Sequence, residues 1–264
     1  MPEGDTVYRT AATLSVLTGK SLVRGDLRHP RLSTVDLSGR VVVGVRTVGK
    51  HLFVRFDRDL SLRNHLGMDG AWQVYPARGR WRRPAFQARA VLVTAEQQAI
   101  GFNLHEMALV PTDEEDRLVA HLGPDLLDPT WGPSHVDEAV ARLTAEPERE
   151  IGLALLDQRV MAGVGNVYKA EICYLLGVSP WTPVSGVDAR LAVELSRKLL
   201  DHNKMSVDRN TTGEQAKDRQ LWVYGRRRGG CLRCGGRVVA GVQGSDVHER
   251  VAYFCPHCQP GPAA

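Results

Sequence analysis

The first residues of the chain place an amine and an acid side by side. The sequence begins Met1-Pro2-Glu3, and a methionine followed by a small proline is a good substrate for removal of the initiator. Removal leaves a secondary amine on Pro2, and an α-amine titrates near pH ~8 against ~10.4 for a lysine. An amine that attacks carbon and an acid that moves protons predict Schiff-base chemistry. By themselves these residues are more typical of a frayed terminus, so the rest of the chain decides.

Four of the five cysteines form two C-x-x-C pairs, Cys231 with Cys234 and Cys255 with Cys258. Two such pairs at this separation are typical of a tetrahedral zinc site, and a closed set of four sulfurs leaves no open coordination position. We therefore expect one structural Zn²⁺. Disulfides are the alternative, which a cytosolic context disfavours. The fifth cysteine, Cys173, is expected to be a buried apolar residue.

Two short apolar runs lie between the cysteine pairs. Residues 237–240 and 251–254 predict the strands of a β-hairpin, with its turn over 241–249. Arg250 begins the return strand, where a rigid hairpin would present its guanidinium to a phosphate. A solvated surface arginine is the alternative interpretation.

The remaining elements divide the chain into a β-rich part and a helical part. Apolar residues at helical spacing predict a first helix over residues 3–18, which would position the N-terminal amine. Short apolar or alternating runs predict the strands of a sandwich or barrel at 41–43, 52–56, 60–62, 72–75, 91–93 and 108–110.

In the second half, helices are predicted over 136–143 and 188–202. Another helix is expected to end near Met161, before a turn at Gly163 and Gly165 and a new helix from Asn166. Backbone amides at that start, the helix dipole and the Asn166 side chain suit a phosphate. A purely structural helix hairpin is the alternative.

Composition limits the class of protein. The 264 residues are 43% hydrophobic and 24% charged, which permits a packed core and argues against global disorder. We find no apolar run of about 18 residues and no signal peptide, so we expect a cytoplasmic protein with no membrane partner. The net charge of +4 permits a polyanionic partner without requiring one.

Taken together, these features resemble the formamidopyrimidine-DNA glycosylase and endonuclease VIII family of base-excision-repair enzymes. The segments that carry the resemblance span nearly the whole chain: Pro-Glu-Gly at 2–4, Gly49-Lys50, His65-Leu-Gly-Met68, Leu155 to Lys169, Val223-Tyr-Gly225, and the cysteine hairpin. The resemblance implies an α+β fold. Its expected parts are an N-terminal catalytic β-sandwich with a leading helix (1–116), a linker (117–133), a helical domain with a helix–two-turn–helix motif (134–225) and a four-cysteine, zinc-bound β-hairpin finger (226–259).

The resemblance also implies an activity, bifunctional DNA glycosylase and abasic-site lyase, with a Schiff base on Pro2 followed by β,δ-elimination. The roles that it implies are Pro2 as nucleophile, Glu3 as proton donor, Lys50 and Arg250 as phosphate contacts that assist catalysis, Asn166 as a further phosphate contact, and Met68 as the side chain that enters the duplex. The expected partner is DNA containing oxidised bases or abasic sites. A monomer is expected.

Three departures from the family pattern bear on the substrate. Thr6 stands where many relatives carry a second glutamate, the stretch from Phe102 to Met107 lacks an Arg-Arg-Phe motif, and the loop between Asn203 and Trp222 is short. The last two departures favour the endonuclease VIII branch, which prefers oxidised pyrimidines, whereas Thr6 leaves open the catalytic or base-recognition role of the missing glutamate.

Three alternatives remain at this point. One is an oxidised-purine glycosylase of the same family. Another is a catalytically silent damaged-DNA-binding protein, because retention of Met1 would turn the nitrogen of Pro2 into an amide. The third is a zinc-finger DNA-binding regulator, which has no need of the pair Pro2 and Glu3.

Overall fold

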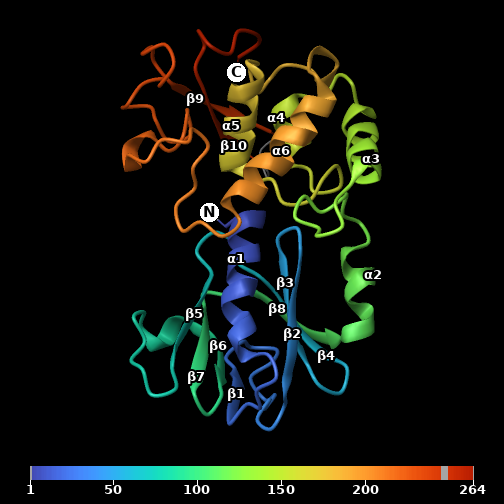
Figure 1. The fold of residues 1–264 in the computed structure, drawn as a ribbon, viewed down its shortest axis with the longest axis vertical. Helices are drawn as coiled ribbons and strands as arrows, with labels where there is room; N and C mark the ends of the chain where they lie inside the picture. The colour runs from blue at the N-terminus through green and yellow to red at the C-terminus, as the bar shows by residue number, and fades with distance from the viewer. Residues whose placement is uncertain (1, 245–248, 264) are drawn as a thin grey trace. The chain divides into compact units, whose positions relative to one another are not determined.

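The computed structural model describes residues 2–244 and 249–263. The chain divides into two compact units, Met1–His121 and Leu122–Ala264 (Figure 1). The boundary between the units, after His121, falls inside residues 117–133, which the sequence predicts to be a linker. The four domain ranges stay predictions. Across the described residues, no helix has both the length and the apolar character that a membrane span needs.

The first unit is a β-sandwich led by a helix. Its helices are α1 (Gly4–Leu14) and α2 (Glu115–Val119), with 3-10 turns η1 (Ser15–Leu17), η2 (Ala85–Gln87) and η3 (Thr112–Glu114). Its strands are β1 (Arg24–Leu27), β2 (Val42–Val48), β3 (His51–Phe56), β4 (Leu60–His65), β5 (Ala71–Pro76), β6 (Ala88–Val93), β7 (Gln97–Phe102) and β8 (Glu106–Pro111). They form two antiparallel four-stranded sheets, β1-β6-β7-β5 and β2-β3-β4-β8.

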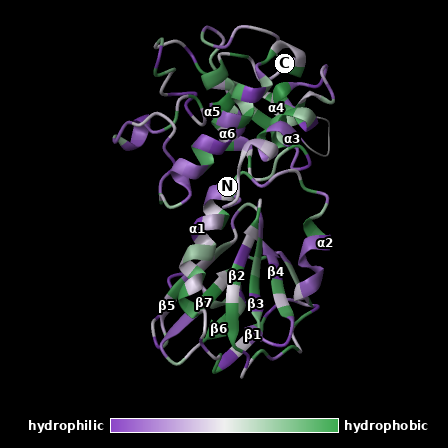
Figure 2. Cartoon of the chain, turned by 45° about the vertical axis from the view of Figure 1, so that its right-hand side comes forward, coloured by the Kyte–Doolittle hydropathy of each residue, from purple (hydrophilic) through white to green (hydrophobic). Residues whose placement is uncertain are grey.

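The core of this unit lies between the two sheets and the apolar face of α1. Val7 and Leu14 of α1 pack with Leu52 and Leu62 of one sheet and Leu92 of the other. Figure 2 shows hydrophobic residues along these strands. The packing fixes α1 along the sandwich. In Figures 1 and 2 the N-terminus of α1 and the tip of the β2–β3 hairpin lie at the same end of the unit.

Two strands of the sandwich, β1 and β7, were missed in the sequence, and each contains a glycine. A Cβ at Gly25 of β1 would lie 2.5 Å from the Leu37 side chain and 2.8 Å from its backbone, and one at Gly101 of β7 would lie 2.4 Å from the end of the Leu104 side chain. Close packing therefore excludes a side chain at Gly25 and disfavours one at Gly101, although glycine weakens a strand pattern. The first helix is also shorter than expected, because α1 ends at Leu14 and continues only as the 3-10 turn η1.

Helix α2 begins with Glu115, whose side chain is buried. Glu115 accepts hydrogen bonds from Arg55 Nε at 3.0 Å, Arg46 Nη1 at 3.0 Å and Ser61 Oγ at 2.6 Å. Two guanidinium groups and a hydroxyl compensate the burial of this carboxylate. They attach α2 to the sheet β2-β3-β4-β8.

The second unit is helical and carries a small hairpin. Its elements are α3 (Pro133–Thr144), α4 (Ile151–Leu156), α5 (Asn166–Leu176), η4 (Val184–Gly186), α6 (Ala189–Asn203), η5 (Lys217–Arg219), β9 (Val239–Gln243) and β10 (Arg250–Phe254). The predicted helix end near Met161 is wrong. Asp157 leaves the helical conformation with ψ of 109°, so α4 ends at Leu156, while the predicted start of the next helix at Asn166 is confirmed.

The hairpin strands β9 and β10 are antiparallel, with Arg250 opposite Gln243 and Phe254 opposite Val239. The first strand starts two residues later than predicted because Val238 is buried in the apolar cluster around the cysteines. It extends further because Gln243 Nε2 donates to Glu150 Oε2 at 2.7 Å and to the Pro180 carbonyl at 2.8 Å. Of the predicted turn, residues 245–248 lie outside the described residues.

Candidate active site and metal centre

Pro2 and Glu3 precede the first turn of α1. Pro2 is half-buried and the Glu3 side chain is fully buried. Glu3 is the N-cap residue, and its carbonyl accepts the Val7 amide at 3.0 Å. The fold thus holds the carboxylate of Glu3 in a buried position directly beside the residue whose nitrogen is the expected nucleophile, while Met1 lies outside the described residues.

Thr6 stands where the family resemblance predicts a second glutamate, and it binds its own neighbour. Asp5 is buried, and its Oδ1 accepts the Thr6 amide at 2.6 Å and the Thr6 hydroxyl at 3.2 Å. Thr6 therefore helps to hold Asp5 in place. A hydrogen-bonded polar pair thus stands where the resemblance predicts a second carboxylate.

Lys50 occupies the two-residue turn between β2 and β3. Gly49 has φ of +57°, a conformation that glycine adopts readily, and Val48 pairs with His51 across the turn. The turn places Lys50 at the tip of the hairpin, which Figures 1 and 2 show at the same end of the first unit as the start of α1.

A group of histidines lies at the base of this turn. The His51 ring centroid is 5.7 Å from that of His65 and 6.4 Å from that of His121. Arg63 Nη2 lies 3.3 Å from His51 Nδ1. Burial, followed by the charges of Arg63 and the neighbouring histidines and Lys50, lowers the pKa of His51 from 6.5 to about 4. Burial also lowers the pKa of His65, so both rings are neutral at neutral pH.

The lowered pKa of His51 predicts a loss of stability in mild acid. Unfolded His51 takes up a proton near pH 6.5 and folded His51 near pH 4, so the free energy of unfolding falls as the pH drops through that window. Above pH ~7 both states are neutral and the contribution is constant. In denaturant titrations at several pH values, the free energy of unfolding should fall more steeply with decreasing pH for the parent protein than for His51→Gln. Equal slopes would contradict the assignment.

Met68 is exposed on the turn between β4 and β5. Its relative exposure is 68%. Gly67 has φ of +59°, and its amide donates to His65 Nδ1 at 3.0 Å. The turn is thus a defined structure that presents Met68 outward.

In the second unit, Asn166 is the first residue of α5 and contacts the hairpin. Its Nδ2 donates to the carbonyl of Val251 at 2.8 Å, and its buried Oδ1 has no hydrogen-bond partner among the described residues. Val251 follows Arg250, whose side chain is exposed. The structure therefore brings Asn166 and the strand that begins with Arg250 together.

The glycine turn before α5 is held by Gln158. Its Nε2 donates to the carbonyls of Leu156 at 2.7 Å and Val164 at 2.9 Å, and its Oε1 accepts the Gly163 amide at 3.0 Å. Gly163 has φ of +122°, which favours glycine. One side chain thus closes the turn that places Asn166 at the helix start.

Two charged residues of α5 were missed in the sequence, Lys169 and Glu171. Both are fully buried. Lys169 Nζ lies 3.4 Å from the same Val251 carbonyl that Asn166 binds. A lysine three residues after Asn166, on the same helix face, was the signal that could have identified it.

Glu171 attaches the following loop to α5. It accepts the amides of Trp222 at 2.8 Å, Val223 at 3.0 Å and Tyr224 at 2.9 Å, as well as the Thr211 hydroxyl. Burial raises the pKa of its carboxyl, and these four donors act in the opposite direction. No local pattern reveals this role, because three of the four donors are backbone amides about fifty residues away and the fourth is the side chain of Thr211, forty residues away.

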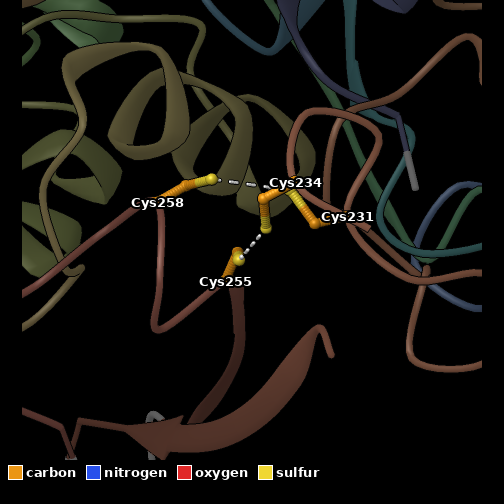
Figure 3. A group of neighbouring side chains, drawn as sticks. All are labelled: Cys231, Cys234, Cys255 and Cys258. Carbon is orange, nitrogen blue, oxygen red and sulfur yellow. Dashed lines mark hydrogen bonds between the residues drawn. The ribbon is translucent and has the colours of Figure 1, made fainter. Parts of the chain in front are cut away.

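The four cysteines of the two C-x-x-C pairs converge (Figure 3). Their sulfur atoms all lie within 4.8 Å of one another, with 3.8 Å between those of Cys231 and Cys258 and 3.6 Å between those of Cys234 and Cys255. Four sulfur donors in a compact group suit a tetrahedral metal ion. The fifth, Cys173, is buried in α5 outside this cluster, as expected.

The sequence matches two family descriptions. “Formamidopyrimidine-DNA glycosylase N-terminal domain” matches residues 1–162, and “Formamidopyrimidine-DNA glycosylase H2TH domain” matches residues 122–218. The “Probable endonuclease 8 2” of Streptomyces coelicolor is 48% identical over 268 residues, which cover 100% of this chain and 95% of that relative. The chain belongs to the formamidopyrimidine-DNA glycosylase and endonuclease 8 family. It is a base-excision-repair DNA glycosylase of this family.

Further relatives are similar over their full length. The “DNA-(apurinic or apyrimidinic site) lyase Nei2” of Mycolicibacterium smegmatis is 46% identical over 261 residues, 98% of this chain and 99% of that protein. A solved structure of Lactococcus lactis formamidopyrimidine-DNA glycosylase, non-covalently bound to DNA with an abasic site, superimposes with a TM-score of 0.80. It covers 98% of this chain and 100% of that chain at 21% identity, a likeness of fold. The α+β fold with a β-sandwich, a helical part and a cysteine cluster is thereby confirmed.

Proposed function

We propose that this family member is a bifunctional glycosylase and abasic-site lyase that removes oxidised pyrimidines from DNA through a Schiff base on Pro2. The observation that carries the proposal is the buried carboxylate of Glu3 beside Pro2 at the start of α1. An α-amine needs little activation at neutral pH, and an adjacent acid supplies proton transfer. A DNA-binding regulator has no use for this pair.

The chemistry follows from these two groups. The damaged nucleotide must leave the base stack before it can react. Glu3 protonates the deoxyribose ring oxygen, the ring opens and the Pro2 nitrogen forms a bond to C1′ as the base leaves. The resulting iminium acidifies the C2′ proton, so that loss of this proton eliminates the 3′ phosphate. A second elimination releases the 5′ phosphate and leaves a gap with phosphates at both ends.

We assign the remaining predicted residues to binding DNA. Lys50 on the hairpin tip would contact phosphates next to the lesion, and Asn166 and Arg250 would hold the backbone around the flipped nucleotide. Guanidinium and ammonium groups are suited to this task. Met68 would fill the space that the flipped base vacates, which offsets part of the unstacking cost by apolar contact.

We also propose that the cysteine cluster holds one Zn²⁺ with a structural role. When bound, the ion would link the two cysteine knuckles at the base of the β9–β10 hairpin, which carries Arg250. A set of four thiolates leaves no position for substrate. Displacement of the base and the two eliminations are therefore left to the residues of the first unit.

A duplex panel tests the substrate assignment. Oxidised pyrimidines such as thymine glycol and dihydrouracil should be excised faster than 8-oxoguanine, and abasic sites should be cleaved in every case. Support comes from the missing Arg-Arg-Phe motif between Phe102 and Met107, and from the endonuclease 8 names of the similar proteins. Faster cutting of 8-oxoguanine would assign the chain to the oxidised-purine branch. Lesion binding without cleavage would indicate a silent binding protein.

Replacing the proton donor separates binding from catalysis. Glu3→Gln should bind lesion duplexes like the parent protein but excise the base about 10²- to 10⁴-fold more slowly, the range for loss of a general acid. Single-turnover excision and a gel-shift titration on the same thymine glycol duplex measure both quantities. The matched control is Glu96→Gln. Glu96 is an exposed glutamate in the turn between β6 and β7, and its carboxylate lies 2.7 Å from Lys20 Nζ. Normal excision by Glu3→Gln would remove Glu3 from the mechanism.

A further inference from the structure

We propose that Asp69 is a positioning residue that holds the Met68 turn (residues 66–70) against the β7–β8 loop (residues 103–105), and that cleavage of duplex DNA depends on it whereas cleavage of single-stranded DNA does not. The inference rests on the proposed entry of Met68 into the duplex. Every contact that carries it lies within the first unit.

The Met68 turn has a closed backbone. The Gly70 amide donates to the Leu66 carbonyl at 2.8 Å, and a Cβ at Gly70 would lie 2.2 Å from that same oxygen and 3.1 Å from the Asn103 carbonyl. The carbonyl of Leu66, within the turn itself, excludes a side chain at Gly70, and the same position lies close to the Asn103 carbonyl of the β7–β8 loop. A displacement of either loop would therefore shift the other.

Asp69 makes the polar contacts between the Met68 turn and the β7–β8 loop. Its Oδ2 accepts Asn103 Nδ2 at 2.7 Å, and its Oδ1 lies 3.6 Å from His105 Nε2. Its carbonyl accepts Arg83 Nη1 at 3.2 Å. Asp69, which directly follows Met68, thus contacts three residues that are distant in the sequence.

Asn103 adopts a strained backbone conformation that suits this contact. Its φ is +51°, a region that asparagine enters more readily than other non-glycine residues but still at a cost. Its amide donates to the Gln87 carbonyl at 2.9 Å, so both its backbone and its side chain are held. Strain that the surrounding contacts maintain at a loop tip is typical of functional positioning.

The exposure of these groups indicates a role other than stability. The side chains of Asp69 and His105 are 58% and 66% exposed, and exposed ion pairs contribute little to the free energy of unfolding. What the contacts fix is the direction of Met68. A duplex resists entry because a base must be unstacked and unpaired, whereas single-stranded DNA has no pairing to disrupt.

The test compares Asp69→Ala, Asp69→Asn and the control Glu96→Ala on one abasic strand, free and annealed to its complement. Asp69→Ala should lower the single-turnover cleavage rate about tenfold on the duplex and less than twofold on the single strand. Asp69→Asn should recover most of the duplex rate, because its amide oxygen still accepts Asn103 Nδ2. With 2-aminopurine opposite the abasic site, the fluorescence rise that reports unstacking should be slowed in Asp69→Ala to the same degree.

The outcomes are distinguishable. An unchanged duplex rate in Asp69→Ala, equal losses on both substrates, or failure of Asp69→Asn to recover the duplex rate would each overturn the positioning role. Parent protein that cleaves neither substrate would instead refute the proposed lyase function. Asp69→Ala should unfold at the same denaturant concentration as the parent, and a large shift would also count against the proposal.

Discussion

Protein that lacks Met1 should be trapped covalently on an abasic duplex by borohydride, and protein whose Pro2 nitrogen is acylated should not be trapped at all. The iminium that borohydride reduces needs a nitrogen lone pair, which an amide does not offer. Trapping should therefore fall to background when the amine is blocked by retained Met1 or by an N-terminal extension. Intact-mass measurement of each preparation establishes which nitrogen is present.

The control for this experiment is a variant in which a primary amine replaces the secondary amine of Pro2. Pro2→Gly leaves a primary α-amine with a similar pKa, so it should still be trapped, at a reduced rate. Blocked protein must still bind the duplex, since Glu3, Lys50 and Met68 are unchanged. Equal trapping with and without the block would assign the covalent bond to a lysine. No trapping by processed, zinc-loaded protein would leave the damage-binding interpretation.

The parts of the fold that the sequence predicted well are those with local chemical logic. The cysteine pairs, the Gly49-Lys50 turn and the helix start at Asn166 are each defined by a few neighbouring residues, and the structure places all of them in the expected elements. The missed strands β1 and β7 contain Gly25 and Gly101, whose close neighbours Leu37 and Leu104 lie outside those strands. Periodicity cannot report such contacts.

The same distinction applies to the candidate site. Pro2, Glu3 and Met68 could be selected from motifs, because their chemistry is carried by residue type and position. Glu171 could not, because its partners are backbone amides of residues 222–224. The burial of Lys169 in the first turn of α5, where the helix dipole disfavours a cation, likewise becomes evident only from the packed structure.

Loss of one zinc ligand should disable the second unit as a DNA-binding surface. Cys234→Ser should reduce the zinc content of purified protein from about one ion per chain to near zero, since structural sites need all four donors. Binding of a structural zinc contributes on the order of 10 kcal/mol of folding free energy. That is more than a small hairpin can replace by packing, so β9 and β10 should lose protection from hydrogen exchange.

The structure predicts how this loss reaches DNA. Asn166 binds the carbonyl of Val251 on β10, and α5 packs against that strand. Disorder of the hairpin would therefore release Arg250 and remove the partner of Asn166 together. Affinity for an abasic duplex should fall by at least about tenfold, and the dependence of affinity on salt should become shallower as phosphate contacts are lost.

Cys173→Ala is the matched control for the cysteine prediction. Cys173 is fully buried in α5, and burial raises the pKa of its thiol to about 12, so it is a neutral packing residue outside the cluster. Its replacement should cost some stability through the small cavity but leave zinc content and the salt dependence of binding unchanged. A Cys234→Ser protein with full zinc content and normal exchange protection would show that three sulfurs suffice. The contribution of the hairpin to DNA affinity would then come from the packing of β9 and β10, and the fourth sulfur ligand would not be needed for it.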